Sequence, residues 1–130
     1  MKKVKFTKEQ RVKYYQELRS KWMMNKLKAD GDDKASQTYK KLGLKVSFYG
    51  FYWTMMQMEE QHLDGLPYID AKTYKGWLET GFKVKKGEKS TLSGIVWREI
   101  KAKDADEDDE PLYLLPKVYS LFHKSQVEKR

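Results

Sequence analysis

Apolar positions recur with a helical period near the start of the chain. Thr7 and Gln10 have the spacing of a capping box, which predicts that a helix begins there. Apolar residues follow at steps of three to five, which predicts one buried stripe on a helix over about residues 7–28. The members of this stripe are Val12, Tyr15, Leu18, Trp22 and Leu27. The polar run 30–33 then predicts a turn.

Two further helices are expected before residue 65. One runs over about 34–42 and is stopped by Gly43. The other is capped by Ser47 and continues to about Leu63. Its apolar residues occupy more than one face, which is typical of a buried helix. We therefore expect it to form the centre of the core.

Alternating patterns in the second half of the chain favour strands. Asp70 is expected to cap a short helix over about 71–79, and an extended segment should lead to a turn at 86–88. Strands are predicted over 91–100 and 112–122, with Pro116 at an edge or bulge. The acidic stretch 101–110 is expected to be a mobile loop, and residues from about Ser125 a tail. The fold class is therefore α+β, with N-terminal helices packed on a small, mainly antiparallel sheet in one domain over residues 1–130.

The charge balance points to a polyanionic partner. The 130 residues include 27 Lys and Arg against 19 Asp and Glu, a formal net charge of +8. Six of the acids lie between residues 104 and 110, so the rest of the chain sets 27 basic residues against 13 acidic ones, or +14. A chain that tolerates such self-repulsion is often one that binds nucleic acid. The alternative is that the lysines are ordinary solvated surface residues.

Several other functions lack the residues that they need. The chain has no cysteine, its two histidines are far apart, and it has no HExxH, GxxxxGK[ST] or GxGxxG motif. We therefore expect no enzyme activity, no metal and no other cofactor. No apolar run is long enough to cross a membrane and no signal-peptide pattern begins the chain, so we expect a cytoplasmic protein without a membrane partner.

Aromatic and basic residues are interleaved between Tyr68 and Trp97. Unpaired bases stack on aromatic rings while ammonium groups neutralise the neighbouring phosphates, so this mixture favours single-stranded nucleic acid. Gly87 can adopt a positive φ and expose backbone N–H groups beside the surrounding lysines. The predicted DNA-binding residues are Tyr68, Lys72, Tyr74, Lys75, Trp77, Lys83, Lys85, Lys86, Gly87, Lys89 and Trp97. The alternative for Trp77 and Trp97 is packing in the core.

Three segments resemble one family. Trp77, Gly81 and the run 84–90 (VKKGEKS) resemble the N-terminal single-stranded-DNA-binding domain of ArdC-like antirestriction proteins. The segments 119–126 and 47–57 are similar to the closing strand and to a helix of the same family, except at Gly50 and His123. The resemblance covers about residues 45–127. We see no match to the metallopeptidase domain that follows in full-length family members, so the resemblance implies DNA binding without proteolysis.

The combined interpretation is a sequence-tolerant single-stranded DNA-binding protein that coats or protects DNA of a phage or mobile element. The Lys-rich first helix would extend its basic surface. Stacking and phosphate contacts do not read the 2′-hydroxyl, so RNA remains an alternative ligand. A protein-interaction module that inhibits a host enzyme is a second alternative. For the acidic loop we consider competition with DNA, recruitment of replication or recombination proteins, or simple solvation. The oligomeric state is not predicted.

Overall fold

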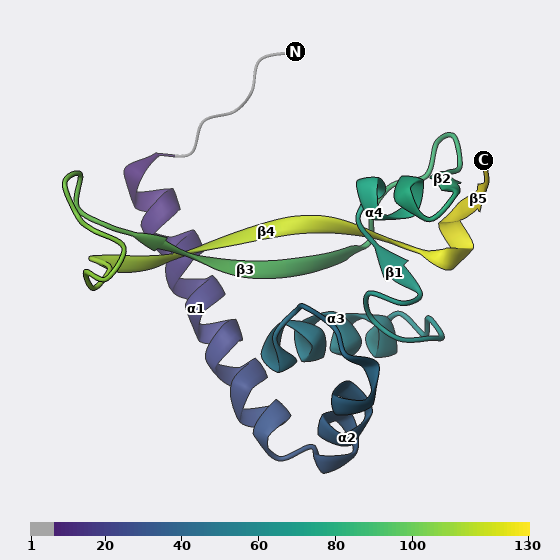
Figure 1. Cartoon of the computed structure of the whole chain (residues 1–130), viewed down its shortest axis with the longest axis horizontal. Coiled ribbons are helices and arrows are strands. Elements are labelled where there is room, and N and C mark those ends of the chain that lie inside the picture. Colours follow the sequence, from purple (N-terminus) through teal and green to yellow (C-terminus); the bar gives the residue numbers. More distant parts are fainter. Residues whose placement is uncertain (1–6) are drawn as a thin grey trace.

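The computed structural model describes residues 7–130 and has the α+β architecture expected from the sequence (Figure 1). The helices are α1 (Lys8–Asp30), α2 (Asp33–Leu42), α3 (Phe48–Glu60) and α4 (Tyr74–Glu79), with a short 3-10 helix, η1 (Lys124–Gln126). The strands are β1 (Ala71–Lys72), β2 (Phe82–Val84), β3 (Leu92–Ile100), β4 (Tyr113–His123) and β5 (Val127–Lys129). No helix among these residues is both long and apolar enough to span a membrane.

The helix starts follow local capping chemistry. The Thr7 hydroxyl accepts from the backbone N–H of Gln10 at 3.1 Å and the Gln10 side chain accepts from the Thr7 N–H at 2.9 Å, which confirms the capping box. Ser47 caps α3, as expected. The expectation for Asp70 is wrong, because Thr73 caps α4 and residues 71–72 form a strand. The Asp70 carboxylate instead accepts from the Leu66 N–H at 2.7 Å and closes a turn.

A long antiparallel hairpin dominates the sheet. β3 pairs with β4 from Leu92 opposite Leu121 to Ile100 opposite Tyr113. β1 adds to the other edge of β4, which gives the order β1-β4-β3. β2 pairs with β5 in a separate two-stranded sheet. The chain end is thus not the expected tail, because the three residues of β5 are held to β2 by backbone pairing.

Helix α3 covers the free edge of β3. The Gln57 side chain accepts from the Ser93 N–H at 2.9 Å and donates to the Ser93 carbonyl at 2.9 Å, so it takes the place of a neighbouring strand. The Thr54 hydroxyl also donates to that carbonyl. Phe51 is fully buried and Met58 is 2% exposed, which confirms that α3 is central to the core. Pairing of this edge by a helix also protects it from association with other strands.

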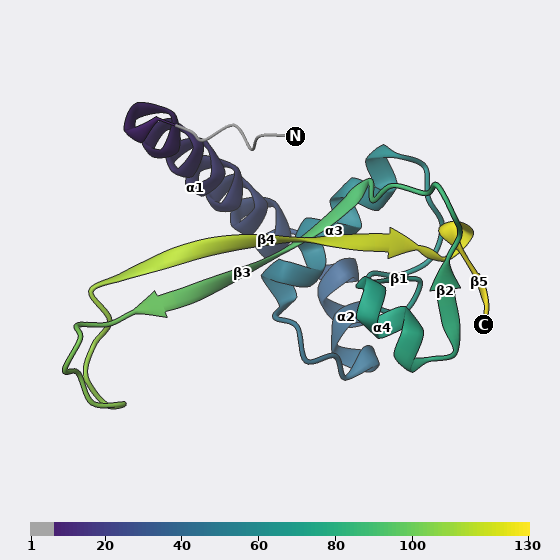
Figure 2. The ribbon, with the colours of Figure 1, turned by 90° about the horizontal axis from the view of Figure 1, so that it is seen from above.

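Helix α1 has two different faces. Leu18, Asn25 and Ala29 are buried, and the Asn25 amide donates to the Tyr49 carbonyl at 2.9 Å. Val12 and Leu27 were expected in the same buried stripe, but they are 50% and 65% exposed. Val12 is exposed because the first half of α1 extends beyond the body of the molecule (Figure 2), and Leu27 is exposed because it lies about 180° around the helix from the buried Leu18. The far end of the β3–β4 hairpin extends in a different direction.

Candidate nucleic-acid interface

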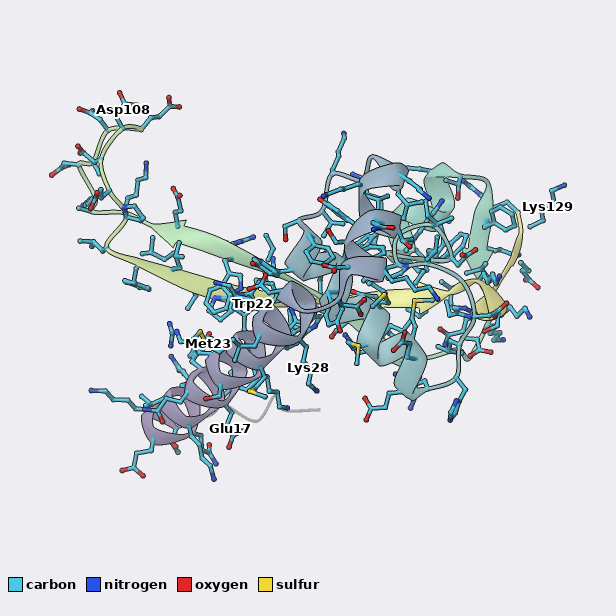
Figure 3. All side chains as sticks on the ribbon, turned by 90° about the horizontal axis from the view of Figure 1, so that it is seen from below. Glu17, Trp22, Met23, Lys28, Asp108 and Lys129 are labelled. Atoms are coloured by element: carbon cyan, nitrogen blue, oxygen red, sulfur yellow. The ribbon has the colours of Figure 1, made fainter. Side chains whose placement is uncertain are left out.

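An open groove of about 600 Å³ lies where α1, the segment between α2 and α3, and the β3–β4 hairpin meet. Four aromatic side chains from four separate segments line it, together with Lys45, Ser47 and aliphatic residues. The aromatic residues are Trp22, Tyr68, Trp97 and Tyr119. Figure 3 shows Trp22 at the point where α1 meets the hairpin. The groove therefore collects flat rings from distant parts of the sequence.

The rings of Trp22 and Trp97, which line the groove, pack against each other, and Trp22 also packs against Trp53. The Trp22 ring lies 5.9 Å from that of Trp97 and 5.8 Å from that of Trp53, measured between centroids. Trp97 is only partly buried, but its indole N–H is buried and has no hydrogen-bond partner among the described residues. An unsatisfied buried donor costs about 1–3 kcal/mol. A buried donor without a partner requires an explanation, and a role in a binding site is one of them.

Two tyrosines also line the groove. The Tyr68 and Tyr119 hydroxyls lie 2.5 Å apart, and Tyr68 has a positive φ of 66°. A tyrosine whose backbone lies in the left-handed region is unusual and strained, and residues with such backbones cluster at functional sites. Burial raises the pKa of Tyr68, and the hydrogen bond with Tyr119 raises it further, so its phenol is neutral at physiological pH. The ring of Tyr119 lies across Gly94, where an added Cβ would come within 2.3 Å of it.

The rim of the groove favours anions. Ser47 lines the groove and is also the N-cap of α3, so the positive end of the helix dipole lies at this rim. Its hydroxyl accepts from the Gly50 N–H at 3.1 Å. Lys45 lines the same side, and the exposed Lys117 pairs with Val96 of the groove across the hairpin. Positive charge and flat rings are thus adjacent.

The structure divides the predicted DNA-binding residues into two regions. Tyr68 and Trp97 line the groove. The others lie on β1, α4, β2 and the turn that follows β2. They are Lys72, Tyr74, Lys75, Trp77, Lys83, Lys85, Lys86, Gly87 and Lys89. β3 runs from just after this turn to the groove, and the five steps along the strand from Leu92 to Trp97 span about 17 Å.

Trp77 does not offer a ring to a base. It is 5% exposed, and its indole N–H donates to the Phe122 carbonyl at 2.8 Å. The Phe82 ring packs against its edge at 5.6 Å and the Lys72 ammonium lies 5.1 Å from its centroid. The prediction that Trp77 stacks on DNA is therefore corrected to a packing role. Tyr74, one turn earlier on α4, is 55% exposed.

The lysines in and beside the turn differ in whether their ammonium groups already have a partner. Lys83 lies 3.7 Å from Glu128, and the Lys85 ammonium donates to the Ser125 carbonyl at 3.3 Å. Lys86 and Lys89 are exposed. Gly87 has a φ of 87°, as expected for the tip of this turn. The turn itself is anchored, because the Gln126 side chain donates to the Lys89 carbonyl at 2.7 Å.

Trp22, Lys45 and Tyr119 of the groove were not predicted as binding residues. Trp22 was assigned to the core stripe of α1, and nothing in the local sequence distinguishes a groove-lining aromatic residue from a core one. Tyr119 lies in the segment 119–126 that resembles the family's closing strand, which was the available signal. Among residues 7–130 no three His, Asp or Glu side chains are placed to hold a metal ion.

Taken together, the chain has an α+β fold with an aromatic groove beside its hairpin. The family profile described as the N-terminal domain of anti-restriction factor ArdC matches residues 48–122, and the chain belongs to this family. Membership supports an antirestriction-related role. Tyr68, Trp97 and Tyr119 lie inside the match, whereas Trp22 and Lys45 lie before it. The chain matches no curated protein and no solved structure.

Proposed function

We propose that the chain binds single-stranded DNA without strong sequence preference and that the groove is the stacking centre of this site. The observation that carries the proposal is the meeting of four aromatic rings with Lys45 and the N-terminus of α3 in one open groove. Rings of this kind stack on unpaired bases, and the rim would receive the adjoining phosphates. Duplex DNA hides its base faces, so it would gain little from these rings.

The turn after β2 has a different part in this proposal. Lys86 and Lys89 hold phosphates at the start of β3, and the bound strand then follows the hairpin to Tyr68 and Trp97 in the groove. Lys85 contributes less, because its ammonium already contacts the Ser125 carbonyl. Coating of DNA in a phage or mobile element, within a host cytoplasm, is the use that we propose for such binding. It agrees with the antirestriction-related family.

The two regions should give different signatures in a titration of a fluorescent oligonucleotide. Trp97→Ala removes a stacking surface worth about 1–3 kcal/mol, so affinity should fall roughly five- to 150-fold with an unchanged salt dependence. Lys86→Ala combined with Lys89→Ala removes two phosphate contacts. The slope of log K against log salt, about −3.5 for five contacts, should become shallower by about 1.4.

Two matched variants serve as controls. Tyr113→Ala removes an exposed aromatic residue that is neither a groove residue nor a predicted binding residue, and Lys40→Ala with Lys41→Ala removes two exposed charges from α2. Both should bind within about twofold of the wild-type chain. Competition with single-stranded DNA, duplex DNA and single-stranded RNA identifies the ligand. Equal competition by the duplex, or affinity that does not depend on salt, would refute the proposal, and stronger competition by RNA would replace DNA as the ligand.

An alternative from another class is inhibition of a host enzyme by protein–protein contact, which the family membership also accommodates. In that case oligonucleotides would not bind at all. The groove residues would then affect only the inhibition of the enzyme.

A further inference from the structure

Exposed apolar residues are concentrated on the two projecting parts of the molecule. Of the twelve large hydrophobic residues that are exposed in the described chain, five lie on α1 and five on the β3–β4 hairpin or beside it. Those on α1 are Val12, Tyr14, Met23, Met24 and Leu27. Those of the hairpin are Val96, Leu112, Tyr113, Leu114 and Val118. Exposed apolar residues that gather in patches mark interaction surfaces, whereas scattered ones do not.

One side of α1 carries three exposed apolar residues, interspersed with the polar residues Glu9, Gln16 and Asp30. At about 100° per residue, Val12, Met23 and Leu27 fall within a sector of roughly 60°. Leu18, Asn25 and Ala29, which are buried, lie roughly on the opposite side of the helix. Figure 3 shows Met23 on the side of α1 that is turned toward the hairpin in this view. Among residues 7–130 these three side chains are at least half exposed, although the neighbouring Arg19 donates to the Leu114 carbonyl of the same chain at 3.3 Å.

The two projecting parts have opposite charges of the same size. Helix α1 has seven Lys and Arg against three Asp and Glu, a net charge of +4. Residues 101–110, at the end of the hairpin, have two Lys against six Asp and Glu, a net charge of −4. Asp108 marks the far tip of this segment in Figure 3, well away from α1 of the same chain. An acidic tip would repel a nucleic acid, so its complementary partner is a basic surface.

We propose that two copies of the chain form a two-fold dimer in which α1 of each copy packs on the hairpin end of the other. Apolar residues Val12, Met23 and Leu27 meet Leu112, Leu114 and Val118, while the basic flanks of α1 meet the acidic tip. Both surfaces occur once in each copy and both project from the body (Figure 2), so one two-fold axis satisfies both contacts and closes the assembly. The dimer does not depend on the proposed DNA binding.

Charge reversal gives a decisive test with protein freed of nucleic acid. The helix variant carries Lys8→Glu, Arg11→Glu and Lys13→Glu, which places acids near the helix N-terminus where they stabilise α1. The tip variant carries Asp104→Lys, Glu107→Lys and Asp108→Lys. Each variant alone sets like charges against each other and should be a monomer. Mixed in equal amounts they restore both contacts and should form a mixed dimer.

Sedimentation velocity measures the result, with circular dichroism to verify folding. The wild-type chain should be a dimer at low salt and dissociate as salt screens the charges. A matched variant with three charges reversed outside the proposed interface, Lys34→Glu, Lys75→Glu and Lys86→Glu, should remain a dimer. A wild-type monomer at every concentration, assemblies larger than a dimer, or dimers of both variants alone would each overturn the proposal. So would a mixture that stays monomeric.

Discussion

The groove and the α4 region contain similar residues but present them differently. Each combines tryptophan, tyrosine and lysine. In the α4 region Trp77 is buried and hydrogen-bonded to the Phe122 carbonyl. In the groove Trp97 is partly exposed, its indole N–H has no partner among residues 7–130, and a tyrosine with a strained backbone lines the same groove. The comparison teaches that composition locates aromatic residues in a segment, whereas the contacts of each ring decide whether it is buried or open to the surface.

The largest effect that distinguishes the two regions is on stability. Trp77→Ala removes a buried ring and its hydrogen bond, so the free energy of unfolding should fall by about 3–5 kcal/mol. Tyr74→Ala, on the same helix, should cost less than about 1 kcal/mol because its ring is 55% exposed. Urea denaturation followed by circular dichroism measures both. Equal losses would show that Trp77 is not the packing residue of α4.

A smaller effect tests the geometry of the groove. Gly94→Ala would place a Cβ 2.3 Å from the Tyr119 ring, so the ring must move or the hairpin must shift. Overpacking of this kind costs about 1–3 kcal/mol. The affinity of this variant for single-stranded DNA should also fall, because the Tyr119 ring of the groove is displaced. Tyr119→Ala removes the obstructing ring, so adding Gly94→Ala to that variant should cost clearly less than adding it to the wild-type chain.

The cost of Gly94→Ala depends on the neighbouring ring rather than on glycine itself. Gly31→Ala serves as the control, because an added Cβ there meets only carbonyl oxygens at 3.8 Å or more and its φ is −91°. That variant should be close to neutral in DNA binding. If Gly31→Ala and Gly94→Ala weaken binding equally, the position of Tyr119 does not shape the site.

Local signals predicted most of the elements. The capping box at Thr7, the N-cap at Ser47 and the stop at Gly43 depend on neighbouring residues alone, and each lies where it was expected. β5 could not be predicted, because Val127–Lys129 is a strand only through its pairing with β2, more than forty residues earlier. Asp70 was misassigned because its carboxylate binds the preceding turn rather than the following helix.

The candidate site was predictable only in part. Trp97 and Tyr68 belong to the aromatic and basic segment and were named from it. Trp22 enters the groove because α1 crosses the hairpin and brings Trp22 against Trp97. These residues are 75 positions apart, so the periodicity of the sequence could not predict their contact. Trp77 was misassigned for the same reason, since its partner Phe122 is 45 residues away. Pattern identifies the residue types, but the topology decides which rings share a surface.

The smallest effect concerns the Tyr68 hydroxyl and appears in alkaline solution. Burial, followed by the hydrogen bond with Tyr119, raises the pKa of Tyr68 above its ordinary value of 10.0. The folded state therefore favours the neutral phenol. This contribution is fully present below about pH 10 and is lost as the pH rises toward the folded pKa. Tyr68→Phe should cost about 1 kcal/mol at neutral pH through the lost hydrogen bond.

The same variant should lose less stability than the wild-type chain when the pH is raised from about 8 to about 11, because a phenylalanine has no proton to lose. Denaturation at both pH values measures the difference, and subtraction cancels the contributions of the other tyrosines. Tyr74→Phe on α4 is the matched control and should follow the wild-type chain at both values. If Tyr68→Phe follows it as well, the hydroxyl of Tyr68 is not held in the folded groove, and the contrast between the two regions rests on the tryptophans alone.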